Sequence, residues 1–70
     1  MNEENRLLIR AALAKMTFAR NRLADAVDNY TAADANRNLF DAQCLLEAVV
    51  SLVAKARHAT PYDPPQEAAQ

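Results

Sequence analysis

The stretch that decides the fold runs from residue 9 to residue 30 and reads IRAALAKMTFARNRLADAVDNY. Seven of its side chains recur at alternating steps of four and three, the spacing of a helix that packs lengthwise on another helix. This first seam consists of Ile9, Leu13, Met16, Arg20, Leu23, Val27 and Tyr30. Ala12, Ala19 and Ala26 lie beside it, seven residues apart, so a second helix can approach closely along that flank. We expect Asn2 to cap this helix, which then runs from about residue 3 to residue 29.

A second seam follows, out of phase with the first. It consists of Leu39, Ala42, Leu46, Val49, Val53 and Ala56, widened by Leu45 and Leu52. Continuing the first seam past residue 30 meets Asp34, Arg37 and Asp41 instead, so an unbroken helix would bring charges onto its apolar stripe. The mismatch predicts a turn near residues 29–35 and a second helix over about residues 35–58.

The expected turn carries the start signal of the second helix. Thr31 and Asp34 fit a capping box, with Asn29 expected in the left-handed region just before it. Asp34 and Asn36 are alternative N-caps. The chain ends in a segment with three prolines and little apolar content, and we expect residues 60–70 to form a flexible tail.

Composition points to the same fold class. The 70 residues include 16 alanines and no glycine, and a chain without glycine has little use for tight hairpins or phosphate-binding loops. The sequence therefore predicts an all-α protein, a two-helix antiparallel hairpin over residues 1–59.

A hairpin of this size has few means of stabilising itself. One cysteine and one histidine supply neither an internal disulfide nor a structural zinc site, which small domains often use. A single hairpin also leaves much of its apolar stripe exposed, so we expect a homodimer in which two hairpins form a four-helix bundle. Arg20 then directs its guanidinium outward, or pairs with Asp41 or Glu47 of a facing helix, or sets the register of the assembly.

Charge and hydropathy narrow the classes of partner. The net charge of −1 lacks the basic excess of a nucleic-acid-binding protein, so nucleic acid is not an expected partner. The longest apolar stretch, residues 48–54, is far shorter than the roughly 20 residues of a membrane span. The acidic start is unlike a secretory signal, and the single Cys44 favours a reducing compartment. We expect a cytoplasmic protein that does not bind membranes.

No pattern in the chain indicates catalysis. Cys44 and His58 are fourteen residues apart, about 20 Å along a helix, which is too far for a nucleophile and its base. Cys44 is instead expected to be a partly buried packing residue, and His58 to interact with the dipole at the end of the second helix. The sequence predicts no enzyme, no cofactor and no metal.

The candidate partner-binding residues lie on the side of the first helix turned away from its seam. Phe18 is about 200° round the helix from Met16, with Lys15 and Arg22 one turn to either side. Exposed aromatic and arginine side chains often dominate the energy of protein binding. Phe40, in the second helix, is a weaker candidate that can also cover the end of the bundle. Scattered apolar residues on a surface are equally ordinary.

Two families resemble this outline. The plasmid copy-number Rop proteins are similar in length and form a dimeric bundle of two-helix hairpins. That resemblance implies binding of paired RNA loops through the outer face of the first helix, here Phe18, Asn21 and Arg22.

The chain also resembles small phage-encoded host-takeover proteins, among them the quorum-sensing anti-activators of Pseudomonas phages. The hairpin design carries this resemblance, together with Lys15, Phe18, Arg22, Asn38 and Phe40. It implies a non-enzymatic inhibitor that binds and occludes a bacterial host protein, such as a LuxR-type transcription regulator. The alternatives are a Rop-like binder of RNA or DNA and a helical subunit of a hetero-complex.

Overall fold

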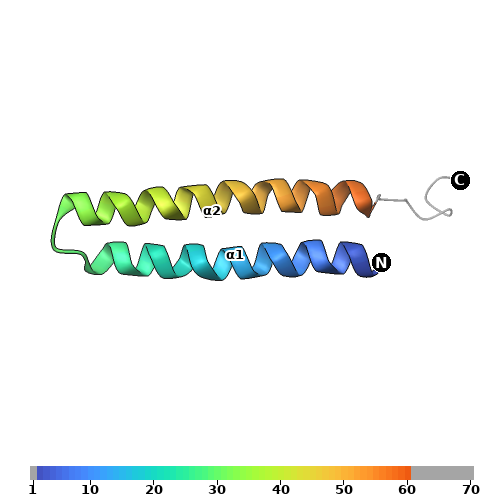
Figure 1. Ribbon diagram of the computed structural model, residues 1–70, viewed down its shortest axis with the longest axis horizontal. Coiled ribbons are helices and arrows are strands. Elements are labelled where there is room, and N and C mark those ends of the chain that lie inside the picture. The colour runs from blue at the N-terminus through green and yellow to red at the C-terminus, as the bar shows by residue number, and fades with distance from the viewer. Residues whose placement is uncertain (1, 61–70) are drawn as a thin grey trace, which may run out of the picture.

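The fold is an antiparallel pair of α-helices. The computed structural model describes residues 2–60, with α1 over Glu3–Asp28 and α2 over Ala32–Ala59. The two helices run side by side for their whole length and are joined by a short link, so the start of α1 and the end of α2 lie at the same end of the hairpin (Figure 1). The predicted all-α hairpin is confirmed. Of the flexible tail expected over residues 60–70, residues 61–70 lie outside the described residues, and Thr60 is the C-cap of α2.

Both helices begin at a side-chain cap. The Asn2 side-chain oxygen accepts a hydrogen bond from the backbone N–H of Asn5 at 2.9 Å, and Thr31 Oγ1 accepts from the N–H of Asp34 at 3.1 Å. Each bond pairs a backbone donor that the first turn of a helix leaves without a partner. Asn2 and Thr31 are therefore the N-caps, as the sequence predicts. Arg57 and His58 lie in the last turn of α2, where the positive charge of the Arg57 guanidinium suits the negative end of the helix dipole.

The link is shorter than the predicted turn and has a different backbone conformation. It consists of residues 29–31, because α2 begins directly after the Thr31 cap rather than near residue 35. Asn29 has φ −71° and ψ 142°, which is extended, and its N–H donates to the carbonyl oxygen of Ala26 at 3.4 Å. The expectation of a left-handed Asn29 is wrong, and no residue from 2 to 60 has positive φ. The two ends of the link, Asn29 and Thr31, are both extended, and the chain reverses its direction without any residue of positive φ.

The contact between the helices is built from alanines. Within residues 2–60 the buried apolar residues are Ala12, Ala19, Ala42 and Ala56. On each helix these residues belong to a row with a spacing of seven, which keeps them on one side of a helix that winds about its partner. A methyl side chain lets two helix backbones approach closely but removes little apolar surface from water. The close approach predicted along the alanine flank is confirmed.

Neither α1 nor α2 combines the length and the apolar character that crossing a membrane requires.

Candidate protein-interaction surfaces

The alanine rows divide the surface of the hairpin into two sides. On one side Arg22 Nε lies 4.0 Å from the carboxylate of Asp41, and the side-chain amides of Asn29 and Asn38 meet at 2.8 Å. These contacts show that one flank of α1 and one flank of α2 share the same side of the hairpin. We call it the polar side. The opposite flanks of the two helices must therefore share the other side of the hairpin.

That other side is apolar and exposed. Its nine large side chains, here called the apolar face, are Ile9, Leu13, Met16, Leu23 and Val27 of α1 and Leu39, Leu46, Val50 and Val53 of α2. All nine are exposed, from Leu46 at 37% to Val27 at 84% of the full residue surface. The prediction that the large seam residues form the core of the hairpin is therefore wrong. They lie beside the contact between α1 and α2, because the buried residues of that contact are alanines. Val49 is half-buried between the helices.

Two predicted seam residues differ from this pattern. Arg20 is exposed and lies in the same row of α1 as Leu13 and Val27, seven residues from each, so it interrupts the edge of the apolar face. Tyr30 lies in the link rather than in a helix and is fully exposed, so it takes no part in the packing between α1 and α2. Val50 is the member of the apolar face that the seam spacing missed, although it follows Leu46 by one helical turn.

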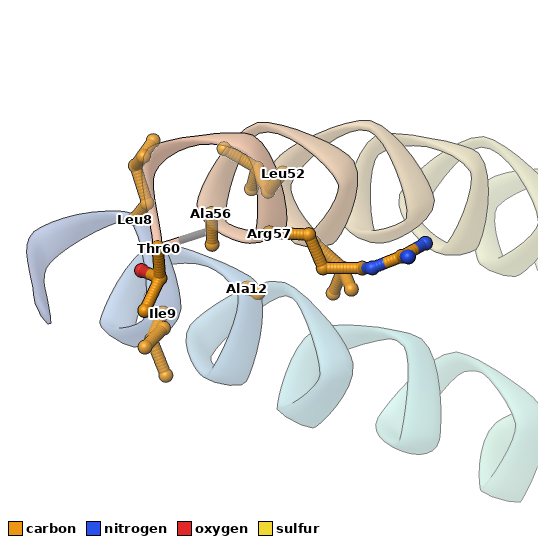
Figure 2. A pocket seen from close by; sticks show the side chains of 8 residues that line it. Leu8, Ile9, Ala12, Leu52, Ala56, Arg57 and Thr60 are labelled. Atoms are coloured by element: carbon orange, nitrogen blue, oxygen red, sulfur yellow. The ribbon is translucent and has the colours of Figure 1, made fainter. Parts of the chain in front are cut away.

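A groove opens at the end of the hairpin where the helices begin and end. Its volume is about 370 Å³, and it is lined by Leu8, Ile9, Ala12, Leu52, Val53, Ala56, Arg57 and Thr60. In Figure 2, Ala56 points from α2 toward α1, and the Arg57 side chain extends along the hairpin away from the helix ends. Because Ile9 and Val53 belong to both, the groove continues the apolar face to the open end of the molecule.

The predicted partner-binding residues of α1 lie together on the polar side. Phe18 is 59% exposed, with Arg22 one turn later and Lys15 one turn earlier; we call these three residues the Phe18 patch. Lys15 is half-buried, so its aliphatic part covers the hairpin, whereas Arg22 is exposed beside Asp41. The exposure predicted for Phe18 is confirmed.

Phe40 is 62% exposed but does not join the Phe18 patch. It lies two residues from the buried Ala42, so it is about 200° round α2 from the contact with α1. This position is on the outer surface of α2. The two phenylalanines therefore belong to different surfaces of the hairpin.

The single cysteine has no role in packing. Cys44 is exposed, contrary to the expectation of a partly buried residue. The reason is its position two residues after Ala42, which turns it to the outside of α2. No group of three or more His, Cys, Asp or Glu side chains that can hold a metal ion occurs within the described residues.

Comparison of the chain with protein-family models, with curated proteins and with solved structures finds no match.

Proposed function

We propose that this chain is a non-enzymatic protein-interaction module that captures another protein through the Phe18 patch and covers a functional surface of it. The observation that carries the proposal is the exposure of Phe18, at 59%, between two cationic side chains on the polar side of the hairpin. Aromatic and arginine side chains are both enriched at protein interfaces and often supply much of the binding energy there.

The geometry of the patch indicates what kind of surface it fits. Arg22 lies beside Asp41 at 4.0 Å, so its side chain is held near the hairpin without being buried. Lys15 rests its stem on the hairpin and keeps its ammonium group available. A complementary partner therefore offers an apolar pocket for the Phe18 ring with carboxylates at its rim. The proposed mode of action is occlusion, as in the phage-encoded inhibitors that the chain resembles, with a LuxR-type transcription regulator as the first candidate target.

Capture from bacterial lysate with matched variants tests the proposal. The tagged wild-type chain is compared with Phe18→Ala/Arg22→Ala and with Leu7→Ala/Arg10→Ala, which also removes one exposed apolar and one arginine side chain from α1. We expect one protein to be captured by the wild type and by the control, and to be lost with the Phe18/Arg22 variant.

Three outcomes would contradict this function. Equal capture by both double variants would show that the Phe18 patch is not the binding surface. Recovery of nucleic acid that dissociates steeply with salt would favour the Rop-like alternative. A wild-type chain that is poorly helical until another chain is added would favour a subunit of a hetero-complex.

A further inference from the structure

The apolar face is too large for a helical hairpin that stands alone. Among residues 2–60 no large side chain is fully buried, and the buried apolar residues are four alanines, flanked by the half-buried side chains of Leu8, Leu45, Val49 and Leu52. A domain of this size normally needs more buried apolar surface, or a covalent or metal link, to remain folded. The large aliphatic side chains that would provide it are present but lie on one outer side of the hairpin.

The exposed apolar area matches the apolar part of a stable interface. A large aliphatic side chain offers roughly 100 Å² for burial when it is fully exposed. The nine side chains of the apolar face are on average about half exposed, so together they present on the order of 500 Å². A standard protein interface buries about 800 Å² on each partner, of which about 65% is apolar in homodimers, again roughly 500 Å².

We propose that a second copy of this chain covers the apolar face, giving a two-fold four-helix bundle in which α1 of each copy packs against α2 of the other. This assembly would convert the nine exposed side chains into a shared core. The polar side, with the Phe18 patch, would remain on the outside of both copies. The proposal thus goes beyond the capture of a protein partner and does not depend on it.

The charges at the two edges of the apolar face favour a second copy as its occupant. Arg20 lies at the α1 edge, and the ion pair found within residues 2–60 joins Arg22 and Asp41 on the polar side, so Arg20 forms no ion pair with another described residue of its own hairpin. Gln43 lies at the α2 edge, seven residues before Val50 in the same row. Its Nε2 donates a hydrogen bond at 3.2 Å to the carboxylate of Glu47, which lies one turn from Val50 in the outer row that also holds Phe40. The α2 edge also carries Arg57 near the open end of the hairpin, in the row of Val50. The charges that complement each other between two copies are therefore those at mid-length, Arg20 of one copy and the Gln43–Glu47 pair of the other.

The same charges select between the two possible two-fold arrangements. Arg6 and Arg20 lie in one row along the α1 edge, so a dimer with α1 against α1 would bring arginines of both copies to one edge. Placing α1 against α2 of the second copy brings Arg20 toward the Gln43–Glu47 pair instead. Opposite charges then meet at mid-length on both edges of the bundle, whereas Arg6 and Arg57 lie level with each other near the open end.

Mass measurements on the intact chain give the first test. We expect sedimentation equilibrium of the wild type to give twice the 7.7 kDa chain mass, and its thermal midpoint to rise with protein concentration. Leu13→Glu/Val50→Glu places charges within the apolar face and should yield a monomer with reduced helicity, whereas Leu7→Glu, at a comparably exposed position of α1 outside that face, should remain a dimer. Three results would overturn the proposal. The wild type could be a helical monomer, or it could be poorly helical on its own. The Leu13/Val50 variant could also remain a dimer.

A charge exchange tests the arrangement without disturbing the apolar side chains. Arg20→Glu and Glu47→Lys should each weaken dimerisation on the order of tenfold, because like charges then meet at both edges. The double variant Arg20→Glu/Glu47→Lys should recover the wild-type dissociation constant. If the double variant keeps its helicity but does not recover the wild-type dissociation constant, the arrangement with α1 packed against α2 of the second copy is excluded. Partner capture is measured separately through the Phe18/Arg22 variant, so either proposal can fail without the other.

Discussion

The side-chain amide of Asn5 donates a hydrogen bond to Thr60 Oγ1 at 2.8 Å and thereby joins two residues 55 positions apart in the chain. The same amide donates to the carbonyl oxygen of Ala59 at 2.7 Å, a group that the end of α2 leaves without a helical partner. Asn5 is only 3% exposed, and its own Oδ1 is buried without a hydrogen-bond partner. One side chain thus closes the open end of the hairpin while the link closes the other.

Replacing Asn5 should open this end of the molecule. In Asn5→Ala both hydrogen bonds to α2 are lost, and we expect the free energy of unfolding to fall by about 1–2 kcal/mol. Chemical denaturation at one fixed protein concentration measures the change, and faster amide exchange at the end of α2 locates it. Asn21→Ala, at an exposed position of α1, serves as the control. Equal stability of the two variants would mean that the Asn5 bonds contribute nothing net.

The alanine contact should tolerate no larger side chain. Ala42 is 1% exposed, so Ala42→Leu must push the helices apart, and we expect a loss of about 1–3 kcal/mol in the free energy of unfolding. Ala54→Leu makes the same chemical change at an exposed position of α2 and should have little effect. Thermal denaturation followed by circular dichroism compares the two. A stable Ala42→Leu variant would contradict close packing through the alanine rows.

The start of α2 should depend on the Thr31 hydroxyl. Thr31→Ala removes the acceptor for the backbone N–H of Asp34 and should cost about 1 kcal/mol of unfolding free energy. The matched change Thr17→Ala, at an exposed position within α1, should leave stability unchanged or slightly higher, since alanine is the better helix former. If the two variants lose equal stability in denaturant titrations, Thr31 does not determine where α2 begins.

The Phe18 patch should contribute little to folding. The Arg22–Asp41 pair is long, at 4.0 Å, and its side chains are 49% and 44% exposed, so solvent screens it and its contribution is at most about 0.5 kcal/mol. Phe18→Ala/Arg22→Ala should therefore keep the helicity of the wild type, as should the control Leu7→Ala/Arg10→Ala. Circular dichroism with denaturant titration measures both. If the free energy of unfolding falls by well over about 1 kcal/mol in the Phe18/Arg22 variant and not in the control, Phe18 and Arg22 stabilise the fold rather than being available for binding.

Local sequence patterns predicted most of the hairpin. The caps Asn2 and Thr31 are visible because a polar side chain directly precedes a helical run, and the phase change between the seams shows that the chain must break near residue 30. The exposure of Phe18 also followed from spacing, since it lies opposite the seam of α1. Spacing did not separate Phe40 from the Phe18 patch, because the relation between residues on different helices depends on how the helices pack.

The sequence by itself therefore determined two helices, their approximate ends and the sides on which apolar and polar residues gather. Only the tertiary structure decided which flank of each helix faces the other. Ile9 and Ala12 are separated by about 60° round α1, so helical periodicity allows either the large seam or the alanine row to form the contact. The alanines form it because their small side chains let the backbones come close, with Asn5 closing one end and a three-residue link closing the other. That choice leaves the larger side chains exposed on one side of the hairpin.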